Sequence, residues 1–403
     1  MPFADRWTIG RELARVASLI ATDAACDLIN WSLPLSPKQL LDDDRGLRLL
    51  LTARELSGGL DAAWPDLIEL TDQFAPSSNC QNSALRLSWA DSRQGDSLPR
   101  TVFVKQPSAD LSIRVFANLI GFWKIECAVC RNLSSRMPIE TPRIHAVREL
   151  RSRFLLVMEN LAERPGILLH VNRELVDGVT QGGAHRCLGA LARLHAGFAK
   201  LSESEREQAL PRSLHPFRSP SLRPIMLAVN RLAAKPCHDR AGDLFDTESL
   251  GLFRRALSKW DAMENAWYRG PLTLVHGDSH WGNFFETPDG IGMLDFQGAH
   301  FGVGLRDVQY FLVNSMTVPE LAACERDLVR HYVEIVSDLG APIAFEDAWE
   351  QYRAFSFQTL MTAVVSLGLG SFTDSDEVMR VMLERSTAAV RRLDFEGWLA
   401  ALR

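Results

Sequence analysis

The sequence lacks a long apolar run. Its longest one, LMTAVVSLGLGSF at 360–372, is shorter than the roughly 18 residues that a membrane span needs. The N-terminus carries charged residues early, beginning with Asp5 and Arg6, where a signal peptide would have an apolar core. We therefore expect a soluble cytoplasmic protein with no membrane partner.

The sequence also lacks an excess of basic residues and a disulfide pattern. It has 44 Lys and Arg against 50 Asp and Glu, a formal net charge of -6, which gives no broad attraction to phosphate backbones. Nucleic acid is therefore not an expected partner. The 7 cysteines are scattered and odd in number, which fits a reducing compartment better than a disulfide framework. Nothing in the sequence specifies an oligomeric state.

The length of the chain predicts two domains. A single core rarely serves more than about 250–300 residues. This chain has 403 residues, of which 46% are hydrophobic and 23% charged, as in ordinary globular proteins. We place the domains at 1–161 and 162–403, because the sequence after this boundary is mostly helical.

The spacing of apolar residues predicts the elements of the first domain. Residues 1–65 have apolar residues three and four apart, as in helices, and 109–136 predicts one long helix without proline. Short branched or aromatic segments between polar turns predict a small antiparallel sheet. The strand candidates are 67–75, 83–89, 101–106, 143–150 and 151–161.

One stretch interrupts the helical pattern of the second domain. Residues 272–275 and 291–294 are predicted to form two short strands, with the TPDG sequence at 287–290 as the turn between them. A small antiparallel sheet followed by a mainly helical domain gives the fold class α+β.

Polar residues cluster around these two predicted strands. The motif HGDSHWGN places Asp278 five positions before Asn283, and DFQ begins with Asp295. This order is typical of phosphoryl transfer, in which the first Asp orients the acceptor hydroxyl and the Asn and second Asp bind Mg²⁺. The three residues could also cap strands and turns individually, but their shared order and spacing favour chemistry.

The same pattern predicts nucleotide contacts in the first domain. A lysine at the end of a strand contacts the phosphates and pairs with a glutamate on the next helix. Lys105 in VFVK and Glu126 in KIECAVC occupy these positions. The segment LLVMENL ends in Glu159, Asn160 and Leu161, whose backbone is placed to bind adenine, although a plain core strand explains it equally well.

Together, these motifs resemble the aminoglycoside phosphotransferase and choline kinase superfamily. The supporting segments are VFVK, ECAVCRNL, VMENL, LARLHA, HGDSHWGN, MLDFQ and GVGLRDVQYFL. The chain looks closest to the ecdysteroid kinase-like branch, which tends to carry DFQ and an N-terminal helix such as LTARELSGGL. The resemblance implies a protein kinase-like two-lobed fold, with a nucleotide-binding sheet lobe and a helical lobe that holds the catalytic loop and the acceptor site.

The resemblance also implies roles for individual residues. Asp278 would be the catalytic base, and Asn283 and Asp295 would be ligands of Mg²⁺. Lys105 and Glu126 would form the phosphate clamp for ATP. Further residues would have supporting roles: His276 would brace the catalytic loop, Asp307 would hold it from the following helix, and His195 would be structural. The substrate would be a small-molecule alcohol, which makes the protein a phosphotransferase with an alcohol group as acceptor.

One segment departs from the usual kinase pattern. The turn that covers the phosphates is glycine-rich in many kinases, because a bare backbone can approach the nucleotide closely. Here it is PSSNCQNS, without glycine, and hydrogen bonds to the phosphates would come from Ser77, Ser78 and Asn79. We expect weak nucleotide affinity or lost activity to be the cost of this change.

Two alternatives stay open. His276, Asp278 and His280 alternate as in a metal-dependent hydrolase, but this hypothesis leaves Asn283 and Asp295 without a role. A nucleotide-binding pseudokinase without transfer activity would carry the same fold. A protein-serine kinase fits less well, because HGD replaces HRD and no APE-type segment follows the DFQ motif.

The helix expected at 349–372 bears on the acceptor. Its sequence has no charged residue beyond Arg353, and Phe357, Leu360, Met361 and Val364 fall on one face. This face could simply pack into the helical lobe. If it lines the acceptor site instead, it offers apolar burial and no carboxylates for amines. We therefore predict a largely apolar alcohol, such as a sterol-like or terpenoid compound, over an aminoglycoside.

Overall fold

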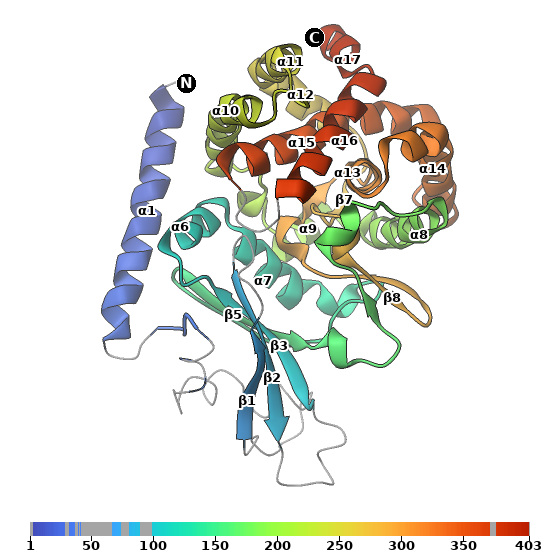
Figure 1. The fold of residues 1–403 in the computed structure, drawn as a ribbon. Coiled ribbons are helices and arrows are strands. Elements are labelled where there is room, and N and C mark those ends of the chain that lie inside the picture. Colours follow the sequence, from blue (N-terminus) through green and yellow to red (C-terminus); the bar gives the residue numbers. More distant parts are fainter. Residues whose placement is uncertain are drawn as a thin grey trace. The chain divides into compact units, whose positions relative to one another are not determined.

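The computed structural model describes residues 3–28, 32–36, 39, 41, 67–73, 80–88, 99–370 and 376–402. The chain forms two compact units, described separately below (Figure 1). The N-terminal unit comprises Met1–Ser135 and Thr141–Ile167, and the C-terminal unit comprises Arg136–Glu140 and Leu168–Arg403.

A five-stranded antiparallel sheet forms the centre of the N-terminal unit (Figure 1). In spatial order its strands are β1 (Leu67–Gln73), β2 (Cys80–Ser88), β3 (Thr101–Pro107), β5 (Arg153–Glu159) and β4 (Ile144–Leu150). All five predicted strands are therefore present. Together with the mostly helical remainder of the chain, they confirm the predicted α+β class.

Both faces of this sheet are covered, and the sequence of β5 shows how. Successive side chains of a strand point to opposite faces. Leu155 and Val157 pack into one buried apolar cluster with Val104 of β3. Phe154, Leu156 and Met158 pack into a second cluster. There the Phe154 ring stacks on the ring of Trp123, with the ring centroids 5.4 Å apart. The strand is apolar from Phe154 to Met158, as expected of a strand that is covered on both faces.

Two helices replace the single long helix predicted at 109–136, so that prediction was wrong. α6 (Leu111–Ile120) and α7 (Phe122–Asn132) are separated by Gly121, which has a φ of 84°. Its backbone N–H bonds to the carbonyl of Ala117 and ends α6. No atom lies within 4 Å of where a Cβ would stand, so backbone conformation and not space favours glycine here.

The N-terminal helix α1 (Phe3–Asp27) is tied to the turn between β4 and β5 by charge. Asp23, which is 1% exposed, accepts a hydrogen bond from Arg151 Nε at 2.6 Å, and Asp27 pairs with Arg153 at 2.6 Å. These pairs fix the helix against the edge of the unit. The segment LTARELSGGL at 51–60 lies outside the described residues.

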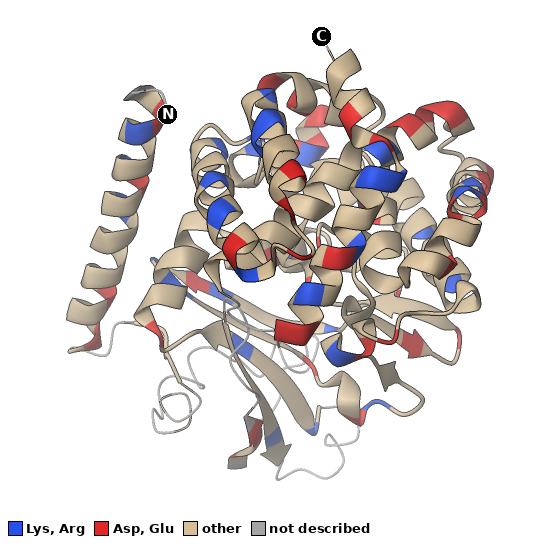
Figure 2. Cartoon of the chain, turned by 45° about the horizontal axis from the view of Figure 1, so that its top comes forward, with Lys and Arg blue, Asp and Glu red and all other residues tan. Residues whose placement is uncertain are grey.

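The C-terminal unit is mainly helical, and its central helix α15 packs against α10, α13 and α16. Lys and Arg are interspersed with Asp and Glu over its helices (Figure 2). Among the described helices, none is both long and apolar enough to cross a membrane. The helices are α8 (Gln181–Phe198), α9 (Glu203–Ala209), α10 (Leu222–Ala241), α11 (Thr247–Ser258), α12 (Trp260–Trp267), α13 (Leu305–Ser315), α14 (Val318–Asp338), α15 (Phe345–Leu369), α16 (Asp376–Arg392) and α17 (Phe395–Ala401).

The strands of the C-terminal unit differ from the predicted pairing. β7 (Thr273–Val275) pairs with β10 (His300–Gly302) and not with the 291–294 segment. β9 (Gly290–Met293) pairs instead with β8 (Phe284–Thr287), a strand that the sequence analysis did not predict. The TPDG turn joins β8 to β9, while β8 also pairs with β6 (Leu168–Leu169). A short 3-10 turn, Trp281–Asn283, lies between β7 and β8, so the HGDSHWGN motif lies between two strands of different sheets.

Candidate active site

The motif HGDSHWGN forms a loop between β7 and β8 that His276 braces from inside. This histidine is 0% exposed, its Nε2 bonds to the carbonyl of Leu294 at 2.9 Å, and its Nδ1 accepts the backbone N–H of Asp278 at 3.2 Å. Burial lowers the pKa of His276, which keeps the ring neutral and suits one donating and one accepting nitrogen. The ring therefore joins the loop to the segment that precedes Asp295.

Gly277 allows the loop to pass close to the DFQ segment. Its φ is 85°, and a Cβ at this position would stand 1.9 Å from the carbonyl oxygen of Gly298. Both the backbone conformation and the lack of space therefore require glycine. At Gly282, the second glycine of the motif, lack of space alone favours glycine, because a Cβ there would lie 2.2 Å from Asn172 Oδ1.

Helix α13 supports the loop through Asp307. Its carboxylate accepts the backbone N–H of His276 at 2.6 Å and that of Gly277 at 3.0 Å, while His195 Nε2 lies 3.2 Å away. Burial opposes ionisation, but the His195 contact and the charge of Arg306 hold the pKa of Asp307 well below its usual range. This carboxylate is thus an ionised acceptor for the backbone of the HGDSHWGN loop.

The same helix contacts the loop at further points. The hydroxyl of Ser279 donates to the carbonyl of Asp307 at 3.0 Å, and the backbone N–H of Trp281 donates to Ser315 Oγ at 3.0 Å. The Trp281 ring also stacks on His170 with centroids 3.8 Å apart, and its Nε1 donates to Glu174 at 3.1 Å. The loop is therefore held along its whole length.

Asp278 lies at the centre of this framework. Tyr310 of α13 donates its hydroxyl to Oδ1 of Asp278 at 3.0 Å, and Gln297 Nε2 lies 3.4 Å from Oδ2. Burial opposes ionisation of Asp278, but nearby His280 and the Tyr310 hydroxyl outweigh it, so the pKa of the carboxyl lies below its usual range. Near neutral pH the group is a fixed carboxylate that can accept a proton.

Asn283 and Asp295 offer oxygen ligands in the same unit. Asn283 donates from Nδ2 to the carbonyl of Asp278 at 2.7 Å, which orients its Oδ1 away from that carbonyl. The backbone N–H of Leu294 donates to the Asn283 carbonyl at 3.0 Å, so Asp295 directly follows a residue bonded to Asn283. Amide and carboxylate oxygens are the donors that Mg²⁺ prefers, so this pair fits the ion predicted from the sequence.

Asp295 has a backbone conformation that is unusual for its type. Its φ and ψ are both 65°, in the left-handed region that glycine and, less often, Asn and Asp adopt. Such strain is kept where the surrounding structure imposes it, and it is frequent at functional sites. Asp295 adopts this conformation directly before the short 3-10 turn Phe296–Gly298.

The Lys105 and Glu126 side chains form a buried ion pair in the N-terminal unit. Lys105 Nζ lies 2.7 Å from Glu126 Oε1, and the side chains are 8% and 6% exposed. Lys105 is on β3 between Asn82 and Leu156 of the neighbouring strands, and Glu126 is on α7. Removing one partner of such a pair leaves a buried charge uncompensated. Glu126 therefore holds the ammonium group of Lys105 in a fixed position.

The predicted adenine segment follows β5. Glu159 bonds to Arg143 through both its backbone N–H and its side chain, at 2.8 and 3.1 Å. The Asn160 side chain accepts the backbone N–H of Ala162 at 3.3 Å and caps a short 3-10 turn, while Leu161 is buried. Ser77, Ser78 and Asn79, predicted to contact the phosphates, lie outside the described residues.

The sequence analysis did not identify Tyr310, Gln297 and Ser315 as parts of the site. Tyr310 and Ser315 follow Asp307 by three and eight positions, which places all three on one side of α13. This spacing can be read from the sequence. However, every residue of α13 is buried, so no pattern of apolar and polar residues marks the side that faces the loop. Gln297 belongs to the DFQ motif, in which the sequence pattern assigns a role to Asp295 only.

The chain was compared with known proteins by sequence and by structure. No curated protein matches the sequence. Solved structures that are similar include an ethanolamine kinase from Plasmodium vivax, with 12% identity, a TM-score of 0.48 and 85% of each chain covered. A choline/ethanolamine kinase family protein from Mesorhizobium loti has 15% identity, a TM-score of 0.47, and 83% of this chain and 92% of that chain covered. A choline kinase from Cryptosporidium parvum has 11% identity, a TM-score of 0.45, and 88% and 94% covered.

The family comparison covers more than half of the chain and includes both the Lys105–Glu126 pair and the HGDSHWGN loop. Residues 92–355 match the phosphotransferase enzyme family. The matched range begins before β3 and ends within α15. The chain therefore belongs to the phosphotransferase enzyme family.

Proposed function

We propose that the protein is a small-molecule kinase that transfers the γ-phosphate of ATP to a hydroxyl group. The observation that best supports this proposal is the fixed, ionised carboxylate of Asp278, held at Oδ1 by Tyr310 within the loop that Asp307 supports. A carboxylate in this position can accept the proton of an alcohol as its oxygen attacks.

In the reaction that we assign to these residues, one bond to the γ-phosphorus forms and one breaks. The acceptor hydroxyl gives its proton to Asp278, and its oxygen forms a bond to the γ-phosphorus of ATP. The bond between that phosphorus and the β–γ bridging oxygen breaks, and its electron pair leaves with ADP. Because the transition state is loose, the residues contribute mainly by positioning and by neutralising charge.

The remaining residues of the proposal bind the nucleotide and its metal. Asn283 and Asp295 would hold Mg²⁺, which when bound neutralises charge on the phosphates. Lys105, oriented by Glu126, would contact the phosphates as a point charge. We assign the backbone of the 159–161 segment to adenine, and Ser78 and Asn79 to the phosphates.

The alternatives differ in how well the geometry supports them. A metal-dependent hydrolase would need His276 as a ligand, but both of its ring nitrogens already have partners in the protein. In the part of the chain that the structure describes, no group of three or more His, Cys, Asp or Glu side chains could hold a metal ion. A pseudokinase would share the fold, so only an assay separates it from a kinase.

The acceptor that we propose is an alcohol of largely apolar character. This rests on the sequence resemblance to the ecdysteroid kinase-like branch alone, because the apolar face of α15 is buried in the core of the unit. Phe357, Leu360, Met361 and Val364 are all buried, and Phe357 packs against Phe395 with ring centroids 5.2 Å apart. This face of α15 thus serves the core of the unit, as the plainer interpretation of the sequence expected.

A panel of hydroxylated compounds tests the proposal. Purified protein is incubated with ATP and Mg²⁺ and with sterol-like and terpenoid alcohols, simple amino alcohols and aminoglycosides, and ADP and phosphorylated product are measured. We expect product with a lipophilic alcohol and none when Asp278→Asn replaces the wild type. Product with aminoglycosides alone would overturn the acceptor class, and tight nucleotide binding without any product would favour the pseudokinase.

A further inference from the structure

Tyr310 occupies a special place beside the proposed base. Its hydroxyl donates to Oδ1 of Asp278 at 3.0 Å, while the residue is only 2% exposed. Burial and the neighbouring carboxylate raise the pKa of Tyr310 well above its ordinary value, so the hydroxyl keeps its proton. Tyr310 is therefore a permanent donor to one oxygen of Asp278.

The ring that carries this hydroxyl is itself fixed. The guanidinium carbon of Arg306 lies 4.5 Å from the centre of the Tyr310 ring, in a cation–π contact. The helix below it is joined to the catalytic loop at Asp307 and Ser315. A tyrosine has few rotatable bonds, and here none can turn without losing these contacts. The hydroxyl is thus held where it can orient a partner.

The two oxygens of Asp278 are not equivalent. Oδ1 has the hydroxyl donor at 3.0 Å, whereas Gln297 Nε2 is 3.4 Å from Oδ2, near the outer limit of a hydrogen bond. His280 Nε2 is 3.9 Å from Oδ2. The stronger contact therefore sets the plane of the carboxylate, and Oδ2 keeps more capacity to accept a further proton.

We propose that Tyr310 is a positioning residue that orients the Asp278 carboxylate, so that Oδ2 takes the proton of the acceptor. This inference rests on the proposed function, because it needs Asp278 to act as the base. The hydroxyl stabilises the ionised carboxylate and fixes its rotation, and it does not contact the nucleotide in this role. Its loss should therefore slow turnover without weakening nucleotide binding.

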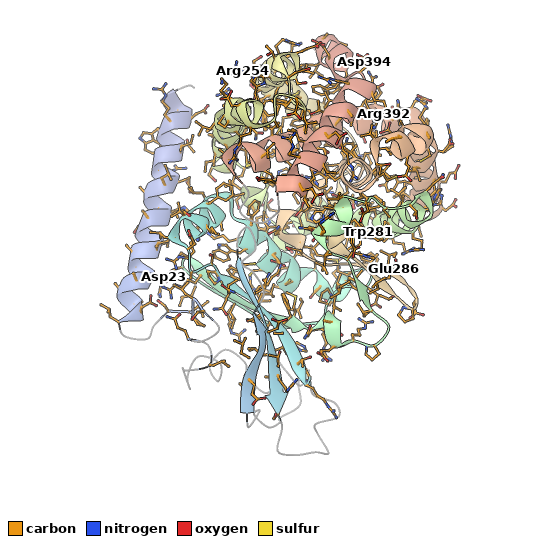
Figure 3. The ribbon with its side chains drawn as sticks, viewed as in Figure 1. Asp23, Arg254, Trp281, Glu286, Arg392 and Asp394 are labelled. Atoms are coloured by element: carbon orange, nitrogen blue, oxygen red, sulfur yellow. The ribbon has the colours of Figure 1, made fainter. Side chains whose placement is uncertain are left out.

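The chain offers a matched control. Tyr352 is 0% exposed and donates its hydroxyl to Glu325 Oε1 at 2.8 Å, so it is also a buried tyrosine bonded to a carboxylate. Glu325 is in turn paired with Arg392, which lies well apart from Trp281 of the catalytic loop (Figure 3). Tyr352→Phe removes the same type of hydrogen bond from the same unit without touching Asp278.

The experiment compares Tyr310→Phe with Tyr352→Phe in the full-length protein. ATP turnover is measured with water as acceptor and with any alcohol found active, Mg-ATP affinity is measured by calorimetry, and folding is checked by thermal unfolding. We expect Tyr310→Phe to lower kcat by about 10- to 100-fold with unchanged Mg-ATP affinity. Tyr352→Phe should keep the wild-type kcat even if both variants lose similar stability.

A double-mutant cycle separates this role from a general structural one. If Tyr310 acts through Asp278, adding Tyr310→Phe to Asp278→Asn should cause no further loss of turnover. Wild-type kcat in Tyr310→Phe, an equal fall in Tyr352→Phe, or a further loss in the double variant would overturn the inference alone. A wild type that turns over no more ATP than Asp278→Asn would instead overturn the proposed function, and this inference with it.

Discussion

The carboxylate of Asp307 accepts the backbone N–H of His276 at 2.6 Å, which joins the start of α13 to the start of the catalytic loop. The Asp307 side chain also contacts His195, and the His276 side chain bonds to the carbonyl of Leu294. The loop is thus held by hydrogen bonds within the protein itself. A base that is already in place lowers the reorganisation needed during the reaction.

Asp307→Asn should damage both stability and turnover. Asparagine can accept only through one oxygen, so its NH₂ group would face a backbone N–H, and we expect a loss of about 2–3 kcal/mol at neutral pH. Because the folded-state pKa of Asp307 is lowered, its stabilisation is present above about pH 4 and is lost as pH falls toward the folded value. Urea unfolding of both proteins should show a difference that shrinks below that pH, and a difference that grows there would contradict the account.

His300 should make the protein less stable in mild acid. Burial lowers the pKa of His300 to about 4, whereas an unfolded histidine titrates near about 6.5. Between these values the unfolded chain binds a proton that the folded chain does not, so unfolding becomes easier as pH falls, by about 1 kcal/mol per pH unit.

The test of this pH dependence is His300→Asn. Asparagine can still donate to the Gly298 carbonyl, which His300 Nδ1 contacts at 3.0 Å, but it does not titrate. The free energy of unfolding, measured at several pH values between about 4 and 7, should fall less steeply in the variant. The same slope in both proteins would show that His300 does not contribute.

Lys105→Ala should raise the ATP concentration needed for half-maximal rate and lower turnover, with a milder effect for Glu126→Ala. The reason is that Lys105 would contact the phosphates directly, whereas Glu126 would act by orienting it at 2.7 Å. In a double-mutant cycle on kcat/KM, the two losses should be strongly non-additive. Additive losses would mean that the residues act separately.

Asp295→Gly should separate stability from metal binding. The residue has a φ of 65°, so glycine relieves backbone strain and should stabilise the fold by about 1 kcal/mol. The same change deletes a carboxylate, so Mg²⁺-dependent ATP binding should be lost. Asp295→Ala lacks the carboxylate and keeps the strain, which makes it the control. Unchanged Mg-ATP affinity in calorimetry would argue against the metal role.

The elements that the sequence predicted well are those with a strong local pattern. The strands of the N-terminal unit are short branched or aromatic segments between polar turns, and the motif around Asp278 has a fixed spacing, so both could be found without a structure. The break at Gly121 was missed because an isolated glycine is tolerated in many helices. β8 was missed because it has only four residues and begins directly after Asn283, the last residue of the HGDSHWGN motif.

The support of the site could not be predicted for a different reason. The contact between Tyr310 and Asp278 joins residues 32 positions apart, and it depends on how α13 packs under the loop. Side-chain patterns within one helix carry no information about which distant group a hydroxyl meets. The pairing of β7 with β10 is of the same kind, because register between separate segments is set by tertiary packing.

The central claim is that Asp278 is the base of a phosphoryl transfer, and the most direct measurement compares Asp278→Asn with the wild type. Asparagine keeps the shape of the side chain and its contact with Tyr310 but cannot accept the proton. The account predicts that transfer from ATP to the acceptor falls by at least about 100-fold while Mg-ATP affinity in calorimetry is unchanged. Near wild-type transfer in Asp278→Asn would contradict the assignment.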